Sequence, residues 1–323
     1  MVVRGGANRR GAAVSASVGP VGPPPIPTPR PLDTASGMPA LSVQKPAPVG
    51  GVAGAGDLAA AYSAAADAWQ RGPGRIYDRL AEVVVAGSPV SLDGARVLDV
   101  GAGTGAATRA VLAAGASSVV AMDVAVGMLA VDAPGRPPAV AGDALALPFA
   151  GASFDLAVAA FSLNHLADPA AGLREMARVT RPGGALLASA YASDDVHPVR
   201  DAVEGALRAR GWQPDDWYAV VKHRTAPLLA TVESALATAR AAGLVEGDAG
   251  LDAEAVRVPF ADLGSADLVA WRLGMAQHAP FVAGLPAADR AALTADAIAR
   301  LGDAAPPLVR SIVVLRATVW PRQ

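Results

Sequence analysis

Residues 96–105 read Arg-Val-Leu-Asp-Val-Gly-Ala-Gly-Thr-Gly, and this stretch decides the fold. Its first half is rich in valine and leucine, which is typical of a strand buried on both faces. The glycines of its second half, Gly101, Gly103 and Gly105, suit a turn in which the backbone comes within contact distance of a ligand. A buried strand that ends in such a turn and leads into a helix forms a ligand-binding crevice in open α/β sheets.

Length and composition exclude several classes of protein. The chain has 323 residues, a formal net charge of -2 and no cysteine. We expect no nucleic-acid partner, because contact with phosphates requires a basic surface. Without cysteine, the chain has no disulfide, no thiolate metal site and no cysteine nucleophile. No apolar run reaches the roughly 18 residues of a membrane span, so we expect no membrane span and a cytoplasmic location. Nothing in the composition indicates the oligomeric state.

The chain begins with a segment that differs from the rest in composition. Residues 1–55 are rich in proline, glycine and alanine and show neither helical nor strand periodicity. Such a segment buries too little apolar surface to offset its ordering entropy, so we predict a disordered tail. From residue 58 onward, apolar residues recur at spacings of three and four, which predicts two helices before the first strand.

Strand and helix signals then alternate along the chain. Strands without polar alternation imply a parallel sheet that is covered by helices on both faces. We therefore predict an open, doubly wound α/β sheet, with two late strands at its edge and the late helices as a cap. The expected strands are 96–100, 118–123, 139–143, 154–160, 185–191, 255–258 and 311–319; the expected helices after the first strand are 106–114, 169–179, 198–210, 231–242, 265–276 and 286–301.

The glycine turn satisfies two templates by letter. It fits the dinucleotide fingerprint G-x-G-x-x-G/A, and it also fits the Gly-x-Gly-x-Gly loop that follows an acid in S-adenosylmethionine enzymes. A dinucleotide sets its pyrophosphate at the helix N-terminus, whereas a sulfonium cofactor carries no phosphate and brings an ammonium group. Asp99 would repel a pyrophosphate and pair with that ammonium group, directly or through water. Asp99 therefore favours S-adenosylmethionine.

Residues at the ends of the next two strands extend this candidate cofactor site. Asp123 ends the second strand, where a carboxylate would accept both hydroxyls of a ribose or, as an alternative, cap a helix. Met128 would lay its thioether on an adenine face, or else belong to the core. Asp143 would accept the adenine amino group while the backbone N–H of Ala144 contacts a ring nitrogen; the alternative is a plain turn at the strand end.

Five motifs, in order along residues 96–191, carry a resemblance to a known family. They are Val97-Leu98-Asp99-Val100-Gly101-x-Gly-x-Gly105; Asp123 with Met128-Leu129; Gly142-Asp143-x-x-x-Leu147-Pro148-Phe149; Phe154-Asp155-x-x-x-x-x-Phe161-x-x-x-His165-Leu166-x-Asp168; and Leu173-x-Glu175-x-x-Arg178-Val179-x-Arg181-Pro182-Gly183-Gly184. As a set they resemble the class I S-adenosylmethionine-dependent methyltransferases, in the small-molecule branch (methyltransferase type 11) that includes the ubiquinone and menaquinone biosynthesis enzymes. The resemblance implies a Rossmann-like, seven-stranded sheet with an antiparallel final strand and helical cap insertions.

The resemblance also implies a division of the chain and an activity. Residues 56–323 are expected to form one methyltransferase domain that binds S-adenosylmethionine. The implied reaction transfers a methyl group to a small, apolar metabolite by in-line displacement, which gains most from holding the two reactants aligned. The motifs do not indicate which metabolite or which atom is methylated. The expected parts of the domain are lid helices over 56–95, a cofactor-binding core over 96–191, a substrate and cap region over 192–310 and a final edge strand over 311–319.

His165 is the candidate catalytic residue. It follows the fourth strand at the carboxyl edge of the sheet, where ligands collect, and an imidazole titrates near neutrality. The alternative is that His165 positions or packs against the cofactor, since the resemblance implies a histidine here in relatives with different acceptors. No recognisable metal motif is present, so we predict no metal. The remaining histidines are expected to be surface or partly buried packing residues: His197, His223 and His278.

Aromatic residues are candidates for the walls of the site. Tyr62, Trp69 and Tyr77 on the leading helices are expected to close over the cofactor, as the equivalent lid does in relatives, or else to pack in the core. Trp271 and Phe281 are expected to line an apolar acceptor pocket, with core packing again the alternative.

Two other functions compete with methyl transfer. A nicotinamide oxidoreductase is suggested by Tyr218-Ala-Val-Val-Lys222, which matches the Tyr-x-x-x-Lys pair of short-chain dehydrogenases. Against it stand Asp99, the Gly142-Asp143 segment and the lack of the Thr-Gly-x-x-x-Gly-x-Gly turn of those enzymes. The other alternative is a catalytically silent module that binds S-adenosylmethionine, although every cofactor position holds a competent residue.

Overall fold

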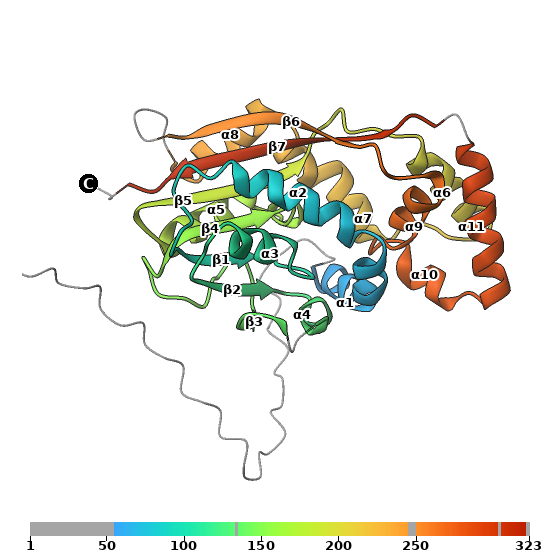
Figure 1. Ribbon diagram of the computed structural model, residues 1–323, viewed down its shortest axis with the longest axis horizontal. Helices are drawn as coiled ribbons and strands as arrows, with labels where there is room; N and C mark the ends of the chain where they lie inside the picture. The colour runs from blue at the N-terminus through green and yellow to red at the C-terminus, as the bar shows by residue number, and fades with distance from the viewer. Residues whose placement is uncertain (1–54, 133–134, 245–249, 303–304, 321–323) are drawn as a thin grey trace, which may run out of the picture. The chain divides into compact units, whose positions relative to one another are not determined.

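The computed structural model describes residues 55–132, 135–244, 250–302 and 305–320. Apart from its last position, the tail predicted over residues 1–55 lies outside the described residues. In the part of the chain that is described, seven strands form one sheet in the order β3-β2-β1-β4-β5-β7-β6 (Figure 1). The doubly wound, seven-stranded α/β fold is therefore confirmed.

The sheet consists of a parallel part and an antiparallel part. β7 (Leu308–Thr318) runs antiparallel to β5, and β6 (Asp252–Phe260) runs antiparallel to β7, which confirms the antiparallel final strand. The parallel strands are β1 (Arg96–Val100), β2 (Ser118–Asp123), β3 (Ala139–Ala141), β4 (Phe154–Ala160) and β5 (Thr180–Tyr191).

The prediction that both late strands lie at the edge of the sheet is wrong for β7. β7 lies between β5 and β6, so β6 alone forms that edge. Side chains of β7 are buried along nearly its whole length, whereas exposed and buried side chains mix along β6. The sequences explain this difference. Residues 311–315 read Ser-Ile-Val-Val-Leu and suit a central strand, whereas residues 252–257 read Asp-Ala-Glu-Ala-Val-Arg and carry the charges typical of an edge.

β5 begins at Thr180 rather than at the predicted residue 185. Its pairing with β4 shifts register after Thr180 and resumes at Ala185, so the residues between them bulge out of the ladder. Gly183 has a φ of +76° in this bulge, a conformation that is open to glycine at little cost. Residues 181–184, Arg-Pro-Gly-Gly, have the sequence of a turn but form a bulge within β5.

Apolar clusters cover both faces of the sheet, because successive residues of a strand point to opposite faces. On β4, Leu156 and Val158 join the cluster on one face, and Ala157 and Ala159 join the cluster on the other. This two-sided burial fixes the strands in register, so that their carboxyl ends meet along one edge. The helices are α2 (Gly74–Ala86) and α3 (Ala106–Ala113) on the first face, and α5 (Pro169–Val179) and α8 (Val232–Ala241) on the second.

The remaining long helices come before β1 and after β5 in the chain. α1 (Ala55–Arg71) comes before α2, so two helices precede β1, as predicted. Figure 1 shows α6 (Val199–Arg208), α9 (Ser265–Leu273) and α11 (Ala287–Leu301) gathered at one end of the sheet, where they pack against one another. None of the described helices combines the length and the apolar character that a membrane crossing requires.

Several short elements were not predicted, because each is too short to show a helical period. The turn η2 carries His165 directly after β4, and α7 with the two turns behind it forms a segment that packs against η2. These elements are α4 (Val126–Ala130), η2 (Leu163–His165), α7 (Asp216–Val220), η3 (Val221–Thr225), η4 (Ala226–Leu229) and α10 (Ala279–Gly284).

Candidate functional site

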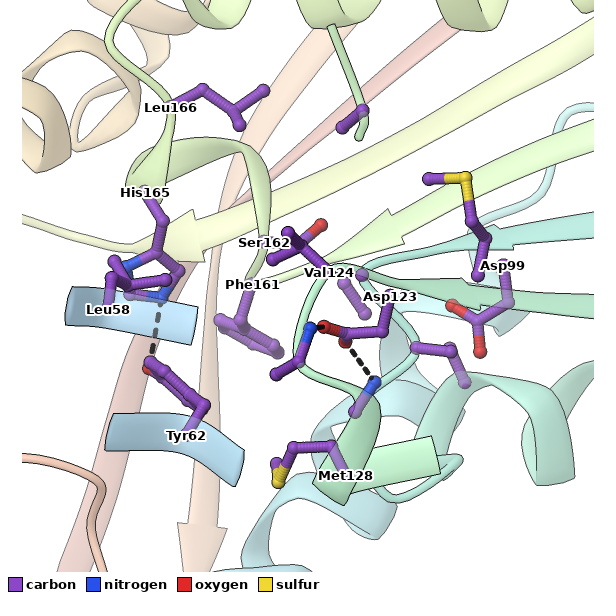
Figure 2. Close-up of a pocket in the computed structure, with 18 of the residues that line it drawn as sticks. Leu58, Tyr62, Asp99, Asp123, Val124, Met128, Phe161, Ser162, His165 and Leu166 are labelled. Carbon is purple, nitrogen blue, oxygen red and sulfur yellow. Dashed lines mark hydrogen bonds between the residues drawn. The ribbon is translucent and has the colours of Figure 1, made fainter. Parts of the chain in front are cut away.

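The carboxyl ends of β1, β2 and β4 open into a pocket with a volume of about 280 Å³. Figure 2 shows Asp99 and Asp123 on one side of it and Tyr62 and His165 on another. The walls come from α1, the glycine turn, the segments after β2 and β3, the turn η2 and the α7–η3 segment. The pocket therefore lies where parallel α/β sheets bind their ligands.

The glycine turn needs glycine for two separate reasons. Gly101 has a φ of +71°, and a Cβ built on it would lie 2.3 Å from the Cβ of Ser162. Gly103 has a φ of +53°, and a Cβ there would stand 3.5 Å from the methyl group of Met128, beside the pocket. Gly105 lies at the N-cap of α3 with a φ of +91° and is not among the residues that line the pocket. Gly101 thus avoids a clash with Ser162, Gly103 supplies a left-handed backbone conformation beside the pocket, and Gly105 supplies one at the start of α3.

Asp99 is a buried acid whose hydrogen bonding is incomplete. Its Oδ2 accepts a hydrogen bond of 2.6 Å from the hydroxyl of Thr108. Its Oδ1 is buried and has no hydrogen-bond partner. Burial raises the pKa of Asp99 to about 6, while the hydrogen bond from Thr108 acts to lower it. A carboxylate in this condition is suited to receive a cationic hydrogen-bond donor.

Asp123 joins the glycine turn to the segment after β2. Its Oδ2 accepts the backbone N–H of Gly103 at 2.7 Å, and its Oδ1 accepts the backbone N–H of Ala125 at 2.8 Å (Figure 2). Burial raises the pKa of Asp123, and these backbone N–H groups act to lower it. Each carboxylate oxygen keeps a lone pair for a ligand, so loop bracing and ligand binding are compatible.

The predicted adenine residues also reach the pocket. Met128 is buried and lines the wall below Asp123. Asp143 and Ala144 line the pocket after β3, and Oδ1 of Asp143 accepts the backbone N–H of Leu145 at 2.9 Å. All the predicted cofactor residues except Gly105 are therefore brought together in one pocket.

This donor set fits S-adenosylmethionine. The unpartnered Oδ1 of Asp99 offers an acceptor for an ammonium group, and the missing side chain at Gly103 leaves room beside Met128. No lysine or arginine is among the described residues that line the pocket. The guanidinium groups of Arg109 and Arg136 lie at the glycine turn, where each donates to a backbone carbonyl, so Asp99 is the residue that disfavours a pyrophosphate. The chemistry thus favours the sulfonium cofactor over a dinucleotide.

Aromatic rings form a further part of the pocket wall. Tyr62, Trp69, Tyr77, Phe161 and Trp217 all line the pocket. The rings contact one another: the centroids of Trp69 and Tyr77 are 4.8 Å apart, and those of Tyr77 and Phe161 are 5.5 Å apart. This half of the pocket is suited to a flat, apolar molecule.

Two aromatic residues predicted to line the pocket lie elsewhere. Trp271 and Phe281 are not among its lining residues, and Trp271 is instead stacked with the guanidinium of Arg310, at 4.6 Å. Trp217 and Thr225 line the pocket instead, and the sequence analysis predicted neither of them. Their spacing of eight residues, with Val221 between them, is a helical signal, but the segment is too short for it to stand out.

His165 forms one polar contact at the aromatic wall. Its Nε2 lies 3.2 Å from the hydroxyl of Tyr62, and its Nδ1 is buried without a partner (Figure 2). Burial lowers the pKa of His165 to about 4, so its imidazole is neutral at neutral pH. A neutral imidazole beside a phenol hydroxyl is a group that accepts or passes on a proton.

The other residues considered from the sequence lie away from the pocket. His278 is fully buried, contrary to the prediction of a surface or partly buried residue, and its Nδ1 donates to the carbonyl of Arg272 at 2.7 Å. Tyr218 and Lys222 do not line the pocket, and Lys222 is exposed. Neither residue of the dehydrogenase pair is therefore part of the pocket wall.

The fold and the pocket define a Rossmann-like domain of the class I methyltransferase type. Residues 98–188 match the profile of the methyltransferase domain family. This part of the chain is an S-adenosylmethionine-dependent methyltransferase domain, which confirms the predicted family.

Individual relatives agree with this assignment over part of their length. A demethylmenaquinone methyltransferase of Renibacterium salmoninarum is 40% identical over 146 residues, which are 45% of this chain and 60% of the relative. A demethylmenaquinone methyltransferase of Mycolicibacterium vanbaalenii is 49% identical over 98 residues, which are 30% of this chain and 42% of the relative. The chain thus spans less than two thirds of either relative, and their activity does not transfer to it by similarity alone.

A solved structure shows a weaker likeness. The phosphoethanolamine N-methyltransferase 2 of Haemonchus contortus, in complex with S-adenosyl-L-methionine, is 16% identical, with 75% of this chain and 53% of that chain covered and a TM-score of 0.45. At that TM-score the likeness supports no statement about activity.

Proposed function

We propose that this protein transfers a methyl group from S-adenosylmethionine to a small, uncharged aromatic acceptor. One observation carries the proposal: acids around the glycine turn and a wall of aromatic rings share a single pocket. The relatives named demethylmenaquinone methyltransferase support an aromatic acceptor, and the aromatic wall supports it independently.

The acidic half of the pocket would hold the cofactor. Asp99 would bind the ammonium group through Oδ1, and Asp123 would bind the ribose hydroxyls through its remaining lone pairs. Met128 would contact the adenine face, while Asp143 and the backbone of Ala144 would contact its edge. When bound, S-adenosylmethionine supplies an electrophilic methyl group on a sulfonium.

The aromatic half of the pocket would hold the acceptor. Rings of Tyr77, Phe161 and Trp217 would fix the plane of the acceptor and exclude water from it. An acceptor with a carboxylate or phosphate in this half would meet no described lysine or arginine, and it would lie near Asp99 and Asp123. Burial of such an uncompensated anion is costly, so we expect anionic acceptors to bind poorly.

His165 and Tyr62 would remove the acceptor's proton. The Tyr62 hydroxyl lies 3.2 Å from Nε2, so it would take the proton of an acceptor hydroxyl while giving its own proton to His165. This transfer leaves a neutral phenol and a protonated imidazole, and the bound acceptor keeps its electron pair for the methyl group. Because burial lowers the pKa of His165, its imidazole is a weak base, and we expect a contribution near the lower end of the roughly 100-fold to 10,000-fold that general bases give.

A binding experiment followed by an activity screen tests the proposal. Calorimetry should show binding of S-adenosylhomocysteine and no binding of NAD or NADP. A panel of phenols and quinols, each paired with a carboxylated analogue, should then release S-adenosylhomocysteine only with the uncharged member. Binding of a dinucleotide alone would overturn the function. Binding of S-adenosylhomocysteine with no turnover on any acceptor would instead support the silent module, and turnover of the carboxylated members would overturn the acceptor class.

A further inference from the structure

Thr108 contacts the cofactor site without lining it. It lies on α3, its side chain is buried, and it is not among the pocket residues. Its hydroxyl donates a hydrogen bond of 2.6 Å to Oδ2 of Asp99, nine positions earlier in the chain. The chain between them is the glycine turn, so this bond ties the end of β1 to the helix that the turn introduces.

The surroundings of Asp99 make this bond important for its charge. Its neighbours in the sheet are Ala121 on β2 and Val158 on β4, neither of which donates to a carboxylate. The charged groups that act on it are Asp123, which opposes its ionisation, and Arg136, which favours it. Burial opposes ionisation more strongly than either. The hydroxyl of Thr108, with a smaller contribution from the Thr108 backbone, thus stabilises a charge that burial and Asp123 disfavour.

The same bond also fixes the direction of the carboxylate. Because Oδ2 is held by Thr108, Oδ1 is left without a partner. Rotation of the carboxylate would break a short, charge-assisted hydrogen bond inside an apolar layer. One oxygen is therefore anchored and the other is kept for a ligand.

We propose that Thr108 is a positioning residue for the cofactor: its hydroxyl orients Asp99 and keeps it ionised, so that Oδ1 receives the ammonium group. This inference rests on the proposed function, and it adds a residue that does not touch the cofactor. Its signature is a dependence on pH, because a carboxylate that loses its donor requires a higher pH to ionise.

The test compares Thr108→Val with Thr108→Ser in calorimetry with S-adenosylhomocysteine. Valine keeps the shape of threonine and removes the hydroxyl, whereas serine keeps the hydroxyl. We expect Thr108→Val to bind about tenfold more weakly than the unaltered protein near pH 7, with the deficit shrinking to about threefold or less near pH 8.5. Thr108→Ser should restore most of the affinity. Affinities are compared as ratios at each pH, so titration of the ligand's own amino group cancels.

Two further variants separate positioning from simple packing. Thr180→Val removes another buried hydroxyl, which donates to the carbonyl of Met176 at 2.8 Å away from the pocket, and should leave the binding ratio unchanged. In an Asp99→Asn background, Thr108→Val should add no pH-dependent loss, since the titrating group is gone. Affinity that falls equally at every pH in Thr108→Val, or that serine does not rescue, would overturn the inference. Absence of binding by the unaltered protein would overturn the proposed function instead.

Discussion

The hydroxyl of Tyr62 lies 3.2 Å from Nε2 of His165, and their rings meet edge to face with centroids 5.5 Å apart. Tyr62 belongs to the helix α1, whereas His165 belongs to the turn η2 after β4. The contact therefore joins α1 to the turn after β4, beside the pocket. In the proposed reaction, this contact gives α1 a part in the proton transfer.

Replacement of Tyr62 by phenylalanine tests this contact. We expect methyl transfer to fall by about 100-fold, because the ring stays in place while the proton relay to His165 is lost. Affinity for S-adenosylhomocysteine should stay within about twofold, since the acids of the glycine turn are untouched. The measurements are single-turnover kinetics on an acceptor from the screen and calorimetry. Tyr218→Phe is the matched control, because Tyr218 is close in sequence to the pocket residue Trp217 but does not line the pocket. A parallel loss of rate and affinity in Tyr62→Phe would assign Tyr62 to packing.

His165 should remain neutral well below the pH at which a free histidine becomes protonated. Burial lowers its pKa to about 4, whereas the unfolded chain binds the proton near 6.5. Because the unfolded state takes up the proton first, the free energy of unfolding falls as the pH drops from about 6.5 towards 4. Imidazole signals of His165 in NMR spectra should therefore stay constant from about pH 8 to pH 5. A titration centred near 6.5 would show that the ring is solvated and that α1 moves away from it readily.

Asp99→Asn should raise the stability of the protein near pH 7 and lower its affinity for S-adenosylhomocysteine. The pKa of Asp99 is raised to about 6, so the ionised carboxylate opposes folding at neutral pH by roughly 3 kcal/mol. We expect the asparagine variant to unfold at higher urea concentration than the unaltered protein near pH 7, and the difference to disappear near pH 4, where the acid is protonated. Calorimetry should show weaker binding of S-adenosylhomocysteine, because the ammonium group loses its anionic partner. Equal stability of the two proteins near pH 7 would mean that Asp99 is better solvated than its burial indicates.

Much of this site could be predicted from the sequence because its signals are local. The strand and glycines over 96–105 and the acids that end β2 and β3 are each marked within a few residues. The acceptor wall was predicted only in part. Trp271 is an aromatic residue of the kind that lines apolar pockets. The direction of its side chain, however, depends on how its helix packs, and in this structure Trp271 stacks on the guanidinium of Arg310. Trp217 lies on the short helix α7, and Thr225 ends η3. The position of this segment depends on contacts of η3 and η4 with η2, which is distant in sequence, so no local pattern indicates it.

Arg310 and Asp195 form a buried ion pair that should be strongly coupled. Their side chains are 2.5 Å apart, and each is 8% exposed. The guanidinium also stacks on Tyr191 at 4.0 Å, behind the aromatic wall of the pocket. We expect Arg310→Met to cost about 3 to 5 kcal/mol, because it leaves a buried carboxylate without its partner.

The double variant Asp195→Asn with Arg310→Met checks this explanation. It should be more stable in urea unfolding than Arg310→Met alone, since no unpaired charge remains, and asparagine still accepts the backbone N–H of Ser311 through its amide oxygen. Additive losses in this double-mutant cycle would show that the pair acts through packing rather than through charge.

Gly101 should be the least replaceable glycine of the turn, and Gly94 provides a control for its backbone. Both glycines have a φ of +71°, but a Cβ on Gly94 would have nothing within 4 Å, whereas a Cβ on Gly101 would lie 2.3 Å from the Cβ of Ser162. Gly94→Ala should therefore cost only the left-handed strain of about 1 to 2 kcal/mol.

Gly101→Ala should lower the free energy of unfolding more than Gly94→Ala does, because the new Cβ also clashes with Ser162. It should also weaken S-adenosylhomocysteine binding, because Ser162 and the turn both line the pocket and one of them must move. The double variant Gly101→Ala with Ser162→Gly removes the clashing Cβ and should recover part of the stability. Recovery cannot be complete, since the φ strain remains and the hydrogen bond from the Ser162 hydroxyl to the carbonyl of Val100 is lost. Urea unfolding of these three variants and of the unaltered protein measures both contributions. Equal costs for Gly101→Ala and Gly94→Ala would show that the strand end yields easily, and glycine at 101 would then be required by its backbone conformation alone.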